Sequence, residues 1–227
     1  MTTAPIVQLT GVSKSFGADA SPTPVLDDVH LAIHPGEKAS LVGPSGSGKS
    51  TLLSLIAGLL RPDAGTVEID GVAMSELDDR HRARMRGERI GIALQSDNLI
   101  PFLTARENVE LALAFGGRST GRSRTAARAR ATGLLDRFEV GHRADHRPRH
   151  LSGGEAQRVA LAVSMANEPA LLLADEVVAQ LDGETAARVV DEVLEADFAV
   201  LYVTHDLALA DLVEHRYVLD GRAVVVR

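Results

Sequence analysis

One eight-residue stretch constrains the fold more than any other: Gly43-Pro44-Ser45-Gly46-Ser47-Gly48-Lys49-Ser50, which matches the pattern G-x-x-x-x-G-K-[ST]. It follows the apolar run 39–42 and precedes an apolar segment that begins at Thr51, so the sequence predicts a strand, a loop and a helix in that order. The glycines let successive backbone N–H groups face a nucleotide phosphate, and the helix N-terminus adds its partial positive charge. Lys49 can reach the β- and γ-phosphate oxygens, and the Ser50 hydroxyl can bind Mg²⁺. A Gly/Ser-rich turn between core elements would not explain why both residues stand where the helix opens, so we interpret the stretch as a phosphate-binding loop.

The composition limits the classes of protein to which the chain can belong. Its 227 residues, 45% of them hydrophobic, suffice for one large domain or for a core with a smaller satellite. The net charge of -7 argues against a protein held on nucleic acid by bulk electrostatics, so we expect no nucleic-acid partner. Cysteine is absent, which excludes disulfides and thiolate metal sites and leaves oxygen ligands for any bound metal. The N-terminus has no signal-peptide pattern and no stretch is long and apolar enough to span a bilayer, so we expect a soluble chain that can dock on a membrane protein.

The segments around the phosphate-binding loop have the pattern of a β-rich lobe. Short strands are predicted at 6–9 and 25–33, separated by a loop that contains glycine and proline. Phe16, in that loop, can be a core filler or can stack on a nucleobase, and the sequence does not decide between the two. A further strand at 66–69 is predicted to leave through a tight turn at Asp70-Gly71.

The middle of the chain predicts a buried strand and a capped helix. The charged stretch 80–89 is interpreted as helical or irregular, and the apolar run 89–94 as a strand that ends at Gln95. A glutamine directly after a buried strand is a candidate ligand or sensor. Thr104 is a predicted N-cap, and Glu107, three residues later, completes the pattern of a capping box.

A basic stretch follows that helix. Five arginines and no acidic residue lie between Arg118 and Arg130. We interpret this stretch as a solvated helix or loop rather than a patch for anionic lipid or nucleic acid, because it has no aromatic residue on which a base could stack.

A second predicted capping box pairs Ser152 with Glu155 at the start of a helix. The capping box alone is a sufficient structural explanation for these two residues. The intervening Gly153 and Gly154 lower helix propensity, however, and this indicates that the exposed N–H groups closely approach another group, for which an anion is the natural candidate.

Two buried strands are predicted to end in polar residues. The apolar run 170–174 leads into Asp175 and Glu176. In this position an aspartate can hold Mg²⁺ through water, and the neighbouring glutamate can polarise an attacking water molecule. The strand 198–203 leads to Thr204-His205-Asp206 at the edge where parallel α/β proteins bind ligands. The end of the chain, from 217 to 226, is predicted to form a hairpin.

Taken together, these features resemble the ATP-binding subunit of an ABC transporter: Phe16, the phosphate-binding loop, Gln95, Leu151 to Gln157, Asp175-Glu176, Leu181-Asp182 and His205. The match covers nearly the whole chain and keeps the order and spacing of the motifs. The resemblance implies these roles: Phe16 stacks on adenine, Gln95 forms the Q-loop and a metal ligand, Ser152 to Glu155 form the signature motif, Leu181-Asp182 form the D-loop, Glu176 is the catalytic base and His205 is the switch histidine.

The resemblance also implies a fold. We expect an α/β P-loop NTPase core of the ABC ATPase type with an antiparallel β lobe and an inserted helical subdomain. The core and lobe would comprise 1–95 and 167–227, and the helical subdomain 96–166.

The implied function is ATP hydrolysis with Mg²⁺ that drives an integral-membrane permease. Two chains, a homodimer or a pair with a related ATPase subunit, would enclose ATP between Lys49 and Ser50 of one and Ser152 to Gly154 of the other. The protein would be cytoplasmic, held at the inner face of the cell membrane by the permease. Local stretches such as 97–109 look like the LolD/MacB/FtsE branch, whose members serve lipoprotein release, macrolide or peptide export, and cell-wall or division control.

The chain departs from that branch at two places, and three alternatives stay open. Val177, Val178, Ala179 and Gln180 stand where the branch reads Pro-Thr-Gly-Asn, and Val163 stands where it carries arginine. These changes leave the phosphate-, metal- and water-handling residues in place but alter the predicted dimer contact. The alternatives are an ABC ATPase that signals to a membrane partner without transport, a non-transport ABC ATPase, and a P-loop kinase or GTPase.

Overall fold

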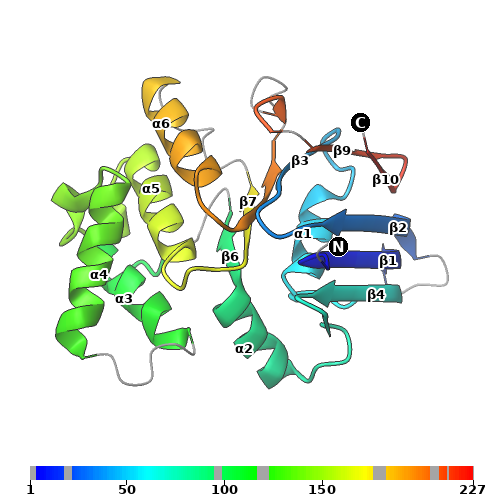
Figure 1. Cartoon of the computed structure of the whole chain (residues 1–227), viewed down its shortest axis with the longest axis horizontal. Helices are drawn as coiled ribbons and strands as arrows, with labels where there is room; N and C mark the ends of the chain where they lie inside the picture. The colour runs from blue at the N-terminus through cyan, green and yellow to red at the C-terminus, as the bar shows by residue number, and fades with distance from the viewer. Residues whose placement is uncertain are drawn as a thin grey trace. The chain divides into compact units, whose positions relative to one another are not determined.

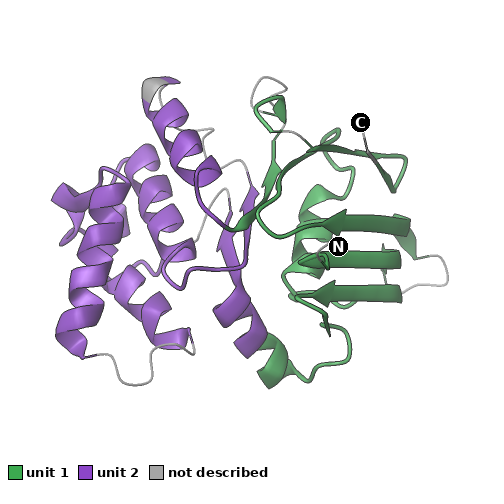
Figure 2. Cartoon of the chain, in the orientation of Figure 1, with its two compact units in different colours: residues 1–83, 198–227 green, residues 84–197 purple. Residues whose placement is uncertain are grey.

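The computed structural model describes residues 4–17, 22–94, 99–116, 123–175, 183–204, 210–213 and 215–226. The chain divides into two compact units, which Figure 2 distinguishes by colour. Unit 1 comprises Met1–Ala83 and Phe198–Arg227, and unit 2 comprises Arg84–Asp197. Among the described residues, no helix has both the length and the apolar character needed to cross a membrane.

An antiparallel sheet of unit 1 has the strand order β2-β1-β4-β5, and Figure 1 labels β1, β2 and β4. Its strands are β1 (Val7–Phe16), β2 (Thr23–Ile33), β4 (Ala64–Ile69) and β5 (Val72–Ala73). The predicted tight turn is confirmed, because Asp70 and Gly71 both adopt positive φ, 52° and 73°, between β4 and β5. This sheet is the expected antiparallel β lobe.

The predicted ends of the first two strands were wrong. The strand predicted to stop at Leu9 continues to Phe16, because the pairing register shifts between Leu9 and Val12 around Gly11, which has a φ of 61°. A bulge of this kind breaks the alternation of buried and exposed residues that marks a strand in sequence. Phe16 and Pro24 consequently lie on strands and not in a loop.

The second sheet region of unit 1 contains β3 (Lys38–Val42) between β8 (Ala199–Val203) and β9 (His215–Asp220). β3 pairs in parallel with both neighbours, and β10 (Ala223–Val226) pairs antiparallel with β9, which confirms the predicted hairpin. All five residues of β8 are buried, as expected for a parallel strand that is covered on both faces. The carboxyl end of β3 leads through the phosphate-binding loop to α1 (Lys49–Ile56).

Unit 2 combines a parallel strand pair with helices. β6 (Ile90–Ala93) pairs with β7 (Leu171–Asp175), and α5 (Gly153–Ser164) packs on β6. Its other helices are α3 (Ala105–Phe115), α4 (Arg124–Arg137), α6 (Gly183–Leu194) and the short 3₁₀ turns η2 (Gly141–Arg143) and η3 (Pro148–His150). The boundary between the units falls within α2 (Asp79–Arg89), so the stretch predicted as helical or irregular is a helix.

Buried apolar side chains explain why these helices pack together. Val109 of α3, Leu135 of α4 and Leu161 of α5 are fully buried, and the three helices contact one another. Burying one such side chain stabilises the fold by about 1.5 to 3 kcal/mol. The predicted division into an ATPase core and a helical subdomain at 96–166 stays a prediction.

Candidate nucleotide-binding site

The phosphate-binding loop leads into α1, whose N-terminus has no capping hydrogen bond from a described side chain. Gly48 is the N-cap residue in the left-handed conformation, with φ of 106°, and no described side chain caps the helix. The first turn also contains no acidic residue. The first backbone N–H groups of a helix have no partner within the helix, so this end presents donors and partial positive charge to an anion.

Two glycines of the loop leave no room for a side chain. A Cβ atom on Gly43 would lie 2.6 Å from the carbonyl oxygen of Leu219, and one on Gly48 would lie 2.9 Å from Cγ1 of Val25. The Ser47 hydroxyl oxygen is buried and finds no hydrogen-bond partner among the described residues. The loop therefore follows a tight path with backbone close to its neighbours, and it retains one polar group that a phosphate oxygen can satisfy.

Lys49 already points its ammonium group across the loop. Its Nζ donates to the carbonyl oxygens of Gly43 at 2.7 Å and Pro44 at 2.9 Å. An ammonium group has three donors, so one remains for a phosphate oxygen without disturbing these bonds. Ser50 is exposed in the first turn of α1 and Thr51 is half-buried beside it.

The capping boxes predicted for α3 and α5 are both present. At α5 the Glu155 N–H donates to Ser152 Oγ at 3.2 Å, and the Ser152 N–H donates to Glu155 Oε2 at 2.8 Å. Arg143 Nε donates to the other Glu155 oxygen at 2.7 Å. The Ser152 N–H and then the Arg143 guanidinium lower the pKa of Glu155 from 4.5 to about 2. The additional role of Gly153 and Gly154 in holding an anion stays a prediction.

The depressed pKa of Glu155 predicts how the stability of α5 depends on pH. Because the pKa is lower in the folded than in the unfolded chain, the charged carboxylate stabilises the fold above pH 4.5, and this contribution is lost as the pH falls toward 2. Glutamine can keep the capping bonds without the charge, so Glu155→Gln should unfold more easily at neutral pH by about 0.5 to 1 kcal/mol. Denaturant unfolding should show this difference shrinking below pH 4.5. A difference that is independent of pH would contradict the assignment.

Several other predicted site residues lie at strand ends or outside the described residues. Asp175 is the last residue of β7 and is half-buried, as expected. Thr204 is buried after β8, and its N–H donates to the carbonyl oxygen of Leu41 at 3.3 Å. Val163 is half-buried on α5. The predictions for the following residues lie outside the part of the chain that the structure describes: Gln95, Glu176, Val177, Val178, Ala179, Gln180, Leu181, Asp182, His205 and Asp206.

The structure excludes the interpretation of Phe16 as a core filler, and its role in stacking on a nucleobase stays a prediction. The side chain is 43% exposed at the end of β1, so it does not fill the core. Lys14 Nζ lies 5.7 Å from the centroid of its ring. Lys14 also forms an ion pair with Asp63, a residue that sequence reasoning did not select because 49 positions separate the two.

The basic stretch is in part a helix that binds other parts of unit 2. Ser123 caps α4, and Arg130 donates to the carbonyl oxygen of Ala166 and to Glu168, the latter at 2.9 Å. Arg130 is therefore a structural residue. Positions 117–122 lie outside the described residues.

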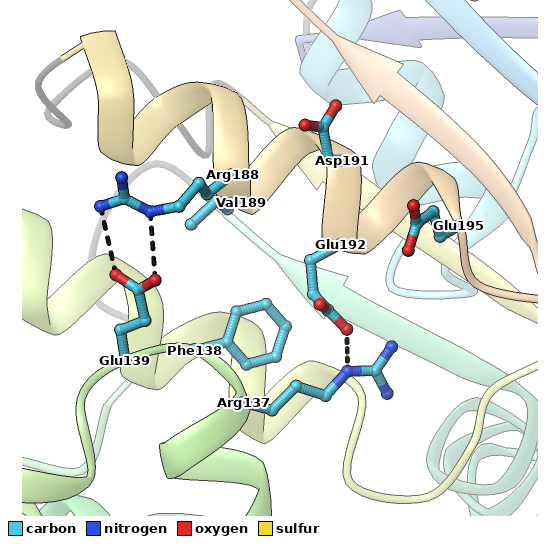
Figure 3. Close-up of a pocket in the computed structure, with 8 residues that line it drawn as sticks. All are labelled: Arg137, Phe138, Glu139, Arg188, Val189, Asp191, Glu192 and Glu195. Atoms are coloured by element: carbon cyan, nitrogen blue, oxygen red, sulfur yellow. Dashed lines mark hydrogen bonds and ion pairs between the residues drawn. The ribbon is translucent and has the colours of Figure 1, made fainter.

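A hollow of about 240 Å³ lies between the end of α4 and α6 (Figure 3). Arg188 forms an ion pair with Glu139 at 3.1 Å on one side, and Arg137 pairs with Glu192 on the other. Phe138 projects between the two pairs, as Figure 3 shows. Four of its six charged side chains pair with one another, so we assign no ligand to this hollow.

The phosphate-binding loop, the parallel strands around it and the antiparallel lobe define a nucleotide-binding protein of the P-loop class. Comparison with known proteins identifies the family: the model of the ABC transporter family matches residues 26–179. The chain belongs to the ABC transporter family and is its ATP-binding, ATP-hydrolysing subunit. The expected fold class is thereby confirmed.

Similar proteins cover nearly the whole chain. The lipoprotein-releasing system ATP-binding protein LolD 2 of Caulobacter vibrioides is 40% identical, with 98% of each chain covered. LolD of Pseudomonas fluorescens is 41% identical, with 90% of each chain covered. The solved structure of the ATP-binding cassette MJ0796, a dimer bound to ADP and Pi in a post-hydrolysis state, matches with a TM-score of 0.91 at 39% identity, covering 96% of each chain. The predicted LolD-like resemblance is confirmed.

Proposed function

We propose that this chain supplies ATP energy to a separate membrane permease that serves export or the handling of lipoproteins or peptides. The observation that carries the proposal is the tight loop before the uncapped N-terminus of α1, with Lys49 lying across it. The names of the similar proteins, which are ATP-binding proteins of lipoprotein-releasing systems, support the choice of cargo.

The loop from Gly43 to Thr51 would bind the phosphates of ATP, and Phe16 would stack on adenine. Mg²⁺ would be held by the Ser50 hydroxyl, the Asp175 carboxylate and the Gln95 side-chain amide, which carry the hard oxygens that this ion prefers. When bound, the ion would neutralise charge on the β- and γ-phosphate groups. Glu176 would accept a proton from the attacking water, and His205 would contact the γ-phosphate.

Two chains would pair head-to-tail around ATP. In that arrangement the loop of one chain and Ser152 to Glu155 of the other hold the same nucleotide, with Asp182 at the contact. The dimeric state of the solved cassettes supports this proposal. The pair can be a homodimer or can include a related ATPase subunit, and it would sit at the inner face of the cell membrane through the permease.

The segment 99–104 is a suitable contact for the permease. The buried Asn108 accepts from the N–H of Ile100 at 2.7 Å and donates to the carbonyl oxygen of Thr104 at 2.9 Å, which fixes the loop. Phe102 is then 69% exposed, whereas Leu103 is half-buried. A large exposed aromatic side chain on a braced loop has the character of an interface anchor.

Phe102→Asp should therefore prevent co-purification with the permease while MgATP still binds normally. Loss of an interface anchor costs about 2 kcal/mol or more, and aspartate adds an unpaired charge. The experiment is affinity purification from cells that also express a candidate permease partner. Val225→Asp, at a side chain that is 51% exposed on β10, is the matched control and should co-purify normally. Recovery of the Phe102→Asp complex at the wild-type level would refute this docking site.

A further inference from the structure

The carboxylate of Asp63 holds the end of strand β1. Its Oδ1 accepts from Lys14 Nζ at 2.6 Å, and its Oδ2 accepts from the backbone N–H of Ser15 at 2.7 Å. The Asp63 N–H donates to the carbonyl oxygen of Ser13 at 2.9 Å. A single residue thus binds the three positions of β1 that immediately precede Phe16.

The end of β1 needs such a contact because the ladder weakens on both of its edges. On one side, the pairing with β4 ends at Ser13 and Ala64. On the other side, Ser15 lies opposite Pro24, which has no N–H to donate, and the register shifts between Lys14 and Ser15. The Asp63 carboxylate accepts the hydrogen bond from the Ser15 N–H and so replaces the carbonyl acceptor that a neighbouring strand would supply.

Asp63 also determines where the Lys14 ammonium lies relative to Phe16. Residues two apart in a strand point to the same face, and Lys14 Nζ lies 5.7 Å from the centroid of the Phe16 ring. A cation at this distance is attracted to the ring face. The ammonium lies over one face of the ring, and the residue is 43% exposed. In the arrangement that we infer, a planar base contacts the opposite face.

The backbone that carries Asp63 is itself closely held. Gly65 has a φ of 79°, and a Cβ atom there would lie 2.2 Å from the carbonyl oxygen of Gly11. Gly11 is at the bulge of β1. The start of β4 therefore packs directly on the backbone of β1. This contact holds in place the backbone next to Asp63.

We propose that Asp63 is a positioning residue for the nucleobase: it holds β1 and Lys14 so that Phe16 presents one face to adenine. The proposal rests on the proposed role of Phe16 in binding ATP. It assigns to the turn after α1 a function in recognising the base, separate from the phosphate contacts of the loop.

The test measures affinity for ligands with and without a base. Calorimetric titrations of the full chain would use MgATP and magnesium tripolyphosphate, with Phe16→Ala, Asp63→Ala, Asp63→Asn and the double variant Phe16→Ala/Asp63→Ala. Stacking of a base on an aromatic side chain sets the scale, so Phe16→Ala should raise the Kd of MgATP roughly tenfold and Asp63→Ala roughly fivefold. Asp63→Asn keeps one acceptor for the Ser15 N–H and should lie between Asp63→Ala and the wild type.

Two results and one control variant distinguish positioning from general destabilisation. Affinity for tripolyphosphate should not change in any variant, and Asp63→Ala should add nothing to the Kd when Phe16 is already alanine. The control is Asp79→Asn, which removes a carboxylate at the start of α2 that pairs with Arg61 and Arg82. This variant should bind MgATP normally.

The outcomes separate this proposal from the proposed function. Wild-type ATP affinity in Phe16→Ala would refute the stacking role and with it the positioning role. Weaker ATP binding in Phe16→Ala but not in either Asp63 variant would leave the function standing and overturn the proposal for Asp63. Loss of tripolyphosphate affinity in the Asp63 variants, or an undiminished effect in the double variant, would also overturn it.

Discussion

Lys49→Ala is expected to lose MgATP binding, with a Kd at least tenfold higher than that of the wild type. The Lys49 ammonium spans the loop through its bonds to Gly43 and Pro44, and its remaining donor would bind a phosphate oxygen in the proposed site. A hydrogen bond to a charged group contributes about 1.5 to 3 kcal/mol, and alanine would remove it together with the only cation in the loop sequence. The variant should therefore fail before hydrolysis, at binding.

The measurement is calorimetric titration with MgATP, accompanied by thermal unfolding without nucleotide. Alanine also removes two bonds to loop carbonyls, so a small loss of stability, about 1 kcal/mol per bond, is expected and must not be mistaken for loss of the fold. Arg84→Ala is the matched control, since it removes a cation whose described partner is Glu88 on the surface of α2. Tight MgATP binding by a folded Lys49→Ala protein would refute the role given to this loop.

The features that the sequence predicted correctly are local ones. The loop sequence lies within eight residues and needs no distant partner, and each capping box pairs residues three positions apart. Asp175 was placed at a strand end because a continuous apolar run precedes it. Patterns of this kind can be read directly because backbone geometry alone brings the residues together.

The features that the sequence did not reveal depend on distant contacts. β1 continues past Gly11 only because β2 and β4 pair with it there, and the bulge hides this continuation from the sequence pattern. The contact of Asp63 with Ser15 joins positions 48 apart, and the pair of Arg137 with Glu192 joins positions 55 apart. No sequence periodicity identifies side chains such as these. Only the folded chain shows that Asp63, in the turn after α1, bonds the three residues that precede Phe16.

Glu176→Gln is expected to separate the two uses of ATP that the proposed mechanism combines. In a head-to-tail pair the γ-phosphate joins the two chains, and hydrolysis releases them. Glutamine nearly matches glutamate in shape but cannot accept a proton, and general base catalysis contributes about 10²- to 10⁴-fold to a rate. The variant should bind MgATP, lose most hydrolysis and accumulate as a dimer, whereas Lys49→Ala should bind MgATP weakly and form little dimer at a concentration that saturates the wild type.

Size-exclusion chromatography with saturating MgATP, together with phosphate release, distinguishes these outcomes. The control variant is Glu195→Gln, which makes the same chemical change at an exposed residue directly after the end of α6. It should hydrolyse ATP and elute like the wild type. The pairing depends on two anion sites in different chains, so Ser152→Ala introduced into the Glu176→Gln protein should weaken its dimer, because alanine removes the hydroxyl at the N-terminus of α5. A Glu176→Gln protein that stays monomeric with its permease present, or that hydrolyses ATP at the wild-type rate, would show that the nucleotide is not enclosed between two chains in this way.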